Sequence, residues 1–96
     1  ESEFLNMSIE VRIPTILRPY TSGEKLVRAQ GVTLEEVLND LEVNYPGIGE
    51  RIIDENGLRR FINIYVNDED VRFLAGLQSV LGENDSITIL PAVAGG

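Results

Sequence analysis

The 96-residue chain contains no cysteine, no histidine and no tryptophan. It therefore lacks the thiol nucleophile and the imidazole base of many enzymes, and it can form neither a disulfide framework nor a zinc site of the usual kind. Any catalysis within the chain would have to rest on carboxylates, hydroxyls, arginines or Lys25, which is its single lysine. The composition leaves few routes to intrinsic chemistry.

Paired carboxylates are present, but their positions favour a structural role. Glu35 and Glu36 lie at an expected helix start, and residues 68–70 (DED) lie in an expected turn, where acidic side chains are ordinarily solvated. The second run also lacks the alternating ligands and the following glycine of a calcium loop. We expect no metal site.

The net charge is strongly negative, and no long apolar run occurs. The 16 acidic and 8 basic side chains give a charge of -8 at pH 7. Such a surface repels phosphate backbones and anionic lipids, so we expect neither nucleic acid nor membrane as a partner, and favour a protein with a basic docking face. No stretch has the pattern of a membrane span or a signal peptide, which predicts a cytoplasmic protein. Residues 1–6 show no periodicity, and we interpret them as a remnant foreign to the domain.

The first half of the chain has the pattern of a hairpin followed by a helix. Residues 7–17 alternate apolar and polar side chains, Pro14 indicates an edge or an end of that strand, and residues 25–30 can return as a second strand. Thr33 followed by Glu36 is a capping box that marks a helix start. The helix carries one apolar stripe, made by Leu34, Val37, Leu38 and Leu41.

The second half predicts two helical turns, at residues 48–53 and 77–81, and three strands. Residues 61–66 are the most strand-like segment and are expected to form a central strand, residues 71–73 a short edge strand, and residues 86–90 the last strand. The long helix precedes the third strand as a crossover, which predicts that this strand runs parallel to an earlier one.

This order of elements predicts one α+β domain over residues 7–91. It is the pattern of a β-grasp, or ubiquitin-like, fold: a mixed sheet of four to five strands with one main helix packed across it. Beyond it the chain ends in small residues. We predict a flexible tail in which Ala92, Val93 and Ala94 thread a channel, while Gly95 and Gly96 bring the terminal carboxylate into another protein's active site.

Three contiguous runs carry a family resemblance: residues 13–19 (IPTILRP), 63–73 (NIYVNDEDVRF) and 88–96 (TILPAVAGG). On these runs, and over residues 7–96 as a whole, the chain resembles the ubiquitin-like sulfur carriers of the ThiS/MoaD family. Within that family it is most similar to the actinobacterial carrier that works with a cysteine synthase.

The resemblance implies that the chain is not an enzyme but a protein co-substrate of other enzymes. An E1-like adenylating sulfurtransferase would activate the Gly96 carboxylate with ATP and magnesium, and the acyl-adenylate would be converted to a thiocarboxylate. A cysteine synthase that uses pyridoxal phosphate would accept the sulfur, and a metalloprotease would release the new cysteine. No bound cofactor is expected on the chain itself.

Three side chains are predicted to form a docking patch beside the tail. Phe61, Tyr65 and Leu90 share the expected outer face of the sheet, next to Thr88 and Arg12. The competing interpretation is that they are ordinary, partly exposed strand residues.

Two other functions would use the same kind of tail. A ubiquitin-like modifier would join Gly96 to a protein lysine, although Lys25 as the single lysine precludes chains of diverse linkage. The small subunit of a molybdopterin-synthase-like complex would instead bind its partner lastingly. The acceptor also stays open between a cysteine synthase and an enzyme of another sulfur-containing metabolite.

Overall fold

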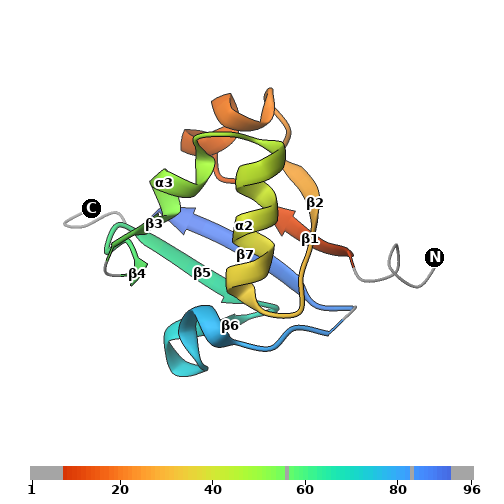
Figure 1. The fold of residues 1–96 in the computed structure, drawn as a ribbon, viewed down its shortest axis with the longest axis vertical. Helices are drawn as coiled ribbons and strands as arrows, with labels where there is room; N and C mark the ends of the chain where they lie inside the picture. Colours follow the sequence, from red (N-terminus) through yellow and green to blue (C-terminus); the bar gives the residue numbers. More distant parts are fainter. Residues whose placement is uncertain (1–7, 56, 83, 92–96) are drawn as a thin grey trace.

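Five strands form one mixed sheet, and a single long helix, α2 (Leu34–Asn44), lies across it (Figure 1). The structure, a computed structural model, describes residues 8–55, 57–82 and 84–91. The order in the sheet is β2-β1-β7-β5-β6, and the strands are β1 (Ser8–Arg12), β2 (Leu26–Gln30), β5 (Ile62–Val66), β6 (Glu69–Asp70) and β7 (Ser86–Pro91). The predicted α+β, β-grasp architecture is confirmed.

The core lies between the sheet and α2. Alternate residues of the strands are buried, because successive side chains of a strand point to opposite faces. From the sheet the core receives, among others, Val11, Ile64 and Ile89; from the helix it receives the whole predicted stripe, Leu34, Val37, Leu38 and Leu41. The sequence period therefore predicted correctly which face each of these elements buries.

The parallel pair of the sheet is formed by its first and last strands. β1 pairs with β2 in the predicted antiparallel hairpin and with β7 in parallel. Among the described residues, β5 pairs with β7 and β6, antiparallel to both. Taken together, these pairings make the third strand, β5, parallel to the earlier strand β2, as predicted, although the two are not neighbours. β5 is also an inner strand, between β7 and β6, as predicted. A crossover connection does not determine which later strand will lie beside the first one.

Two segments predicted as strand are 3-10 helices. The strand expected over residues 7–17 ends at Arg12, and after Pro14 the chain forms η1 (Thr15–Thr21). The edge strand expected at residues 71–73 is η2 (Val71–Phe73), while the edge pairing is made by β6 just before it. The side chain of Asp70 explains the second case, since it accepts a hydrogen bond from the backbone N–H of Arg72 at 2.8 Å and so caps the turn.

The remaining elements are short. The helical turn predicted at residues 48–53 is present as α3 (Ile48–Ile52), which leads into a two-stranded hairpin, β3 (Ile53–Asp54) with β4 (Gly57–Leu58). The second predicted turn is a 3-10 helix one residue earlier, η3 (Gly76–Gln78). None of the described helices has the length and apolar content needed to span a bilayer.

The start of α2 is capped as predicted, with one difference. The hydroxyl of Thr33 accepts a hydrogen bond from the N–H of Glu36 at 3.3 Å, while the Glu36 carboxylate accepts the N–H of Val32 at 2.8 Å instead of that of Thr33 itself. Both side chains thus satisfy backbone donors at the helix start.

Replacing Thr33 by Ala should lower the free energy of unfolding by about 1 kcal/mol, because one backbone N–H at the helix start loses its acceptor. Urea denaturation followed by circular dichroism measures the change. Thr33→Ser keeps the hydroxyl and should stay close to the wild type. A loss of equal size in both variants would show that the methyl group, and not the cap, matters.

The turn before β7 is held by a carboxylate. Asp85 accepts hydrogen bonds from the N–H of Gly82 at 2.8 Å and from the side-chain amide of Asn67 at 3.0 Å. These two donors, the backbone one first, lower the pKa of Asp85 below its ordinary value of 3.8. Because the pKa is lower in the folded chain than in the unfolded one, this carboxylate stabilises the fold above its unfolded pKa, and the effect is lost as the pH falls through the folded pKa.

Asp85→Asn should therefore be less stable than the wild type at neutral pH and nearly equal to it in strong acid, where Asp85 is protonated in both states. Urea midpoints of both proteins at the two pH values test this. A difference that persists unchanged in acid would assign the effect to side-chain geometry and not to charge.

Candidate functional site at the end of the last strand

The last strand ends at a fixed place in the sheet. Its final residue, Pro91, pairs with Ile62, so that β7 ends at the edge where β5 begins (Figure 1). β7 is also held on its other side by β1. The register with β1 ends at Thr88, so the last three residues of β7 are paired with β5 alone. The five residues assigned above to the tail, Ala92, Val93, Ala94, Gly95 and Gly96, lie outside the described residues, and their roles stay predictions.

Two of the three predicted docking residues, Tyr65 and Leu90, share the outer face of the sheet, whereas Phe61 lies before the start of β5. Arg12, Thr88 and Tyr65 lie side by side on β1, β7 and β5, and Leu90 lies opposite Asn63 one step closer to the end of β7. These positions alternate with buried residues, so their side chains point away from α2. Tyr65, Thr88 and Leu90 also line a shallow depression of about 250 Å³.

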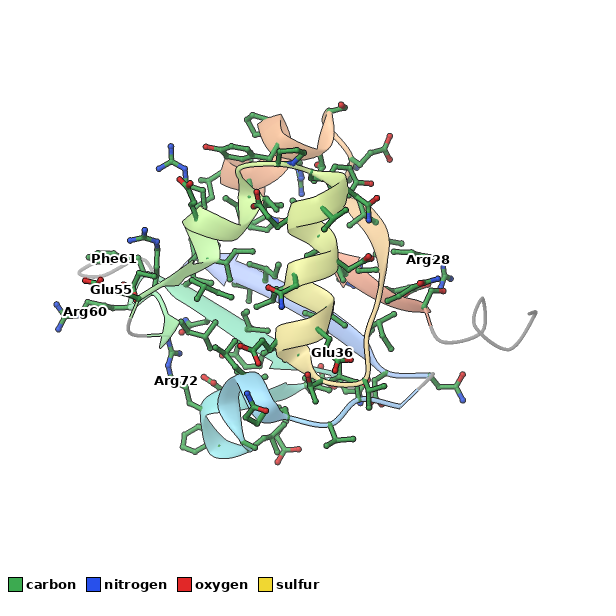
Figure 2. The ribbon with its side chains drawn as sticks, viewed as in Figure 1. Arg28, Glu36, Glu55, Arg60, Phe61 and Arg72 are labelled. Atoms are coloured by element: carbon green, nitrogen blue, oxygen red, sulfur yellow. The ribbon has the colours of Figure 1, made fainter. Side chains whose placement is uncertain are left out.

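Apolar exposure on this face rises toward the end of β7. Leu90 is 44% exposed and Phe61 63%, while Tyr65 is half-buried. Phe61 lies in the turn before β5 together with Arg60, and both project from the edge at which β7 ends (Figure 2). An exposed aromatic and an exposed aliphatic side chain next to the point where the chain leaves the sheet are suited to contact a protein partner.

Arg72, which was not among the predicted site residues, links η2 to the start of β5. Arg72 donates from one Nη to the backbone oxygen of Ile62 at 2.8 Å and from the other to Asn63, and it lies 3.7 Å from a carboxylate oxygen of Asp70. Its contacts thus connect β6 and η2 to the first residues of β5. No local sequence pattern marks it, because its partners are set by the pairing of β5 with β6.

A groove opens on the other side of the same edge. It has a volume of about 410 Å³ and lies between η1, α3 and the chain that leads into β5. Apolar side chains form most of its wall and two arginines border it; the lining residues are Ile16, Leu17, Pro19, Tyr20, Arg51, Arg59, Phe61 and Ile62. Phe61 thus belongs to both the groove and the edge at which β7 ends.

Acidic and buried polar side chains are further candidates for site residues. Within residues 8–55, 57–82 and 84–91, no three acidic side chains are grouped so as to hold a metal ion. The buried polar side chains in this part of the chain, Thr21 and Ser79, are hydrogen-bonded to nearby backbone groups and so have a structural role. What the site presents is a surface around an emerging chain end.

Comparisons with known proteins give a consistent result. A family model described as the ThiS family matches residues 11–96. The sulfur carrier protein CysO of Mycobacterium tuberculosis is 59% identical over 93 residues, which are 94% of this chain and 100% of that protein. Its crystal structure has a TM-score of 0.85 at 58% identity, covering 88% of this chain and 99% of CysO.

Two further solved structures extend the comparison. The BexX/CysO complex of Amycolatopsis orientalis contains a chain with a TM-score of 0.87 and 55% identity, covering 92% of this chain and 99% of that one. The small archaeal modifier protein 1 of Methanosarcina acetivorans has a TM-score of 0.78 and 32% identity, covering 93% and 96%. The similarity therefore spans nearly the whole chain and includes a protein seen in complex with a partner.

Proposed function

Since this chain belongs to the ThiS family, we propose that it is a sulfur carrier protein whose Gly96 carboxylate is adenylated, converted to a thiocarboxylate and then used as a sulfur donor. The observation that carries the proposal is the 59% identity to a sulfur carrier protein over that protein's full length. The geometry supports it, because β7 is an inner strand of the sheet and is paired with β5 up to its last residue, Pro91.

The chemistry follows from the nature of a carboxylate. A carboxylate is a poor electrophile, so its oxygen first attacks the α-phosphate of ATP, and pyrophosphate leaves. The acyl-adenylate then has a good leaving group, and sulfide can displace AMP from the carbonyl carbon to give the thiocarboxylate directly. A persulfide of the activating enzyme would instead give an acyl disulfide, and a second thiol of that enzyme would then cleave its S–S bond, forming an enzyme disulfide and releasing the thiocarboxylate. In this scheme ATP and magnesium are bound by the activating enzyme, and the chain contributes the substrate and not the catalyst.

The partners proposed for these steps are proteins. An E1-like adenylating sulfurtransferase would load the sulfur, a cysteine synthase that uses pyridoxal phosphate would accept it, and a metalloprotease would release the product. All three would act in the cytoplasm. A thiocarboxylate delivered in this way transfers sulfur without release of free sulfide, since the nucleophilic atom stays attached to the carrier until the acceptor's active site is reached.

The test is intact-protein mass spectrometry of the full chain after incubation with ATP, magnesium, a sulfur source and the activating enzyme of the same organism. We expect the mass to rise by the difference between one sulfur and one oxygen atom. An unchanged mass, with an enzyme shown to be active on another carrier, would contradict the proposal, as would an adenylate that never receives sulfur.

The outer-face residues should act in docking. Exchanging Tyr65 and Leu90 together for Ala should weaken binding of the activating enzyme by about tenfold or more, because exposed aromatic and aliphatic side chains at a partner surface carry much of the binding energy. Isothermal titration calorimetry with the full chain measures this. Val43→Ala, on the exposed side of α2, is the matched control and should change nothing. Equal affinity of all three proteins would leave these residues as ordinary strand positions.

A modifier function is the second candidate, because the fold and 32% of the matched residues are shared with an archaeal modifier protein. Both functions begin with the same acyl-adenylate and differ only in the nucleophile, which for a modifier is a protein lysine. Trypsin would cut a conjugate after Arg72, the last basic residue of the chain, so mass spectrometry of digested total cell protein would detect residues 73–96 as a remnant on target lysines. Such remnants would favour a modifier, and a thiocarboxylate alone would favour the carrier.

A further inference from the structure

The groove beside the end of β7 combines apolar walls with unused cationic groups. Two exposed apolar side chains, Ile16 at 57% and Phe61 at 63%, face solvent at its border, and the buried Leu17 and Ile62 lie within its wall. Exposed apolar surface of this kind is suited to receive one bulky side chain of another protein. The inference below rests on the proposed function, since it concerns the partners that function requires.

The two arginines of the groove are positioned by their Nε atoms. Arg51 donates from Nε to the hydroxyl of Tyr20 at 2.6 Å and lies over that ring, 5.7 Å from its centroid. Arg59 donates from Nε to the backbone oxygen of Glu50, also at 2.6 Å. Each contact fixes the guanidinium plane and leaves the Nη atoms without a partner among the described residues. An arginine held in this way can bind a carboxylate at little further cost in side-chain entropy.

No carboxylate of the described part of the chain neutralises these two arginines. The ion pairs there are Arg28 with Glu10 and Arg72 with Asp70. The lining of the groove thus contains two arginines and no acidic residue, on a chain whose net charge is -8. Electrostatic complementarity selects an acidic segment for this site, although the chain's overall charge favours a basic partner surface elsewhere.

We propose that this groove docks an extended segment of the activating enzyme in which a bulky apolar side chain is flanked by carboxylates. The apolar side chain lies against Ile16 and Phe61, and the carboxylates accept hydrogen bonds from Arg51 and Arg59. Because Phe61 is shared with the edge at which β7 ends, the docked segment lies next to the emerging tail. The groove thus adds a second contact, separate from the outer face of the sheet, that orients the tail toward the enzyme.

The first test requires no sulfur transfer. The ¹⁵N-labelled full chain is titrated with the peptide acetyl-Glu-Asp-Leu-Phe-Asp-Glu-amide and with its neutral counterpart acetyl-Gln-Asn-Leu-Phe-Asn-Gln-amide. The acidic peptide should shift the amide signals of Ile16, Tyr20, Arg59 and Phe61, and the neutral one should bind about fivefold more weakly. Absence of shifts at the groove, or equal binding of both peptides, would overturn the proposal.

The second test uses the activating enzyme. Arg51→Gln/Arg59→Gln should weaken its binding to the full chain by about tenfold, with a smaller salt dependence than the wild type. Lys25→Gln/Arg28→Gln removes the same charge and is the matched control, because neither residue lines the groove and Arg28 lies on β2, at the opposite edge of the sheet (Figure 2). The single exchanges show how much each arginine contributes to the affinity. A thermal melt of every variant shows whether a loss of affinity comes from a loss of folded protein.

Each outcome has a definite reading. Equal losses of affinity in both double variants would show that only net charge matters and would overturn the proposal. It would also be overturned if the wild type formed a concentration-dependent dimer that Arg51→Gln/Arg59→Gln did not form, because the groove would then bind a second copy of the chain. If, in the absence of peptide, deletion of Gly96 changed the amide signals of the groove residues, the groove would bind the chain's own end, and the proposal would be overturned. If the enzyme transfers no sulfur yet the peptide and affinity results hold, the proposed function fails while the docking site stands.

Discussion

Deletion of Gly96 should abolish sulfur loading and leave the fold unchanged. The shortened chain ends at Gly95, one residue too early for its carboxylate to reach the atoms that adenylate it, and a displacement of about 1 Å already costs about a hundredfold in rate. Intact-mass spectrometry should show no gain of sulfur after incubation with the activating enzyme. Gly95→Trp should lower the rate of loading by about a hundredfold, because any large side chain obstructs a narrow passage.

Thermal melting provides the control for both variants. The core residues that the structure describes all precede both positions, and a chain end is expected to contribute little to folding. The melting temperatures should match that of the wild type. A large drop in melting temperature would show that the tail contributes to folding, and normal loading of Gly95→Trp would remove the argument for a narrow passage.

The sequence predicts best what depends on local periodicity. The stripe on α2 and the alternation in β5 follow directly from spacings of three to four and of two residues, and the structure buries those faces. The shared outer face of Tyr65 and Leu90 was predictable for the same reason, since each side chain's direction follows from its place in its own strand. These features require no knowledge of which strands are neighbours.

Features that depend on long-range pairing were less accessible. The parallel pairing of β1 with β7 joins the two ends of the domain, and only the assembled core decides it. The η2 turn replaces a predicted strand because the Asp70 carboxylate competes locally with the ladder for the N–H of Arg72. Strand propensity alone does not show whether the N–H of Arg72 will bond to the Asp70 carboxylate or to a neighbouring strand.

The groove shows the same limit in the candidate site. Ile16, Arg51 and Phe61 come from three separate segments, and no spacing relates them. Arg51 would read from sequence as a solvated charge on a short helix. Its partner Tyr20, 31 residues earlier, lies in η1, a segment predicted partly as strand. A tertiary contact between two such segments can be found only in the folded chain.

The second large effect concerns the core, and one helix supplies both the variant and its control. Leu41 and Val43 lie two positions apart on α2, with Leu41 fully buried and Val43 76% exposed. Leu41→Ala removes buried methyl groups and leaves a cavity beneath the helix, which should lower the free energy of unfolding by about 2–5 kcal/mol. The total free energy of unfolding of a small domain is only about 5–15 kcal/mol, so this loss is a large fraction of its stability.

Val43→Ala should instead stay within about 0.5 kcal/mol of the wild type, because the side chain is already in water and Ala has the higher helix propensity. Urea denaturation of the three proteins gives the comparison. If Leu41→Ala were as stable as Val43→Ala, the conclusion that Leu41 packs between α2 and the sheet would be contradicted. Since Ile87 and Ile89 of β7 belong to the same core as Leu41, Leu41→Ala should also reduce sulfur loading in proportion to the fraction of unfolded protein. Deletion of Gly96 should instead act on a fully folded chain. Measuring stability and loading on the same samples therefore separates loss of the carrier's fold from loss of its reactive end.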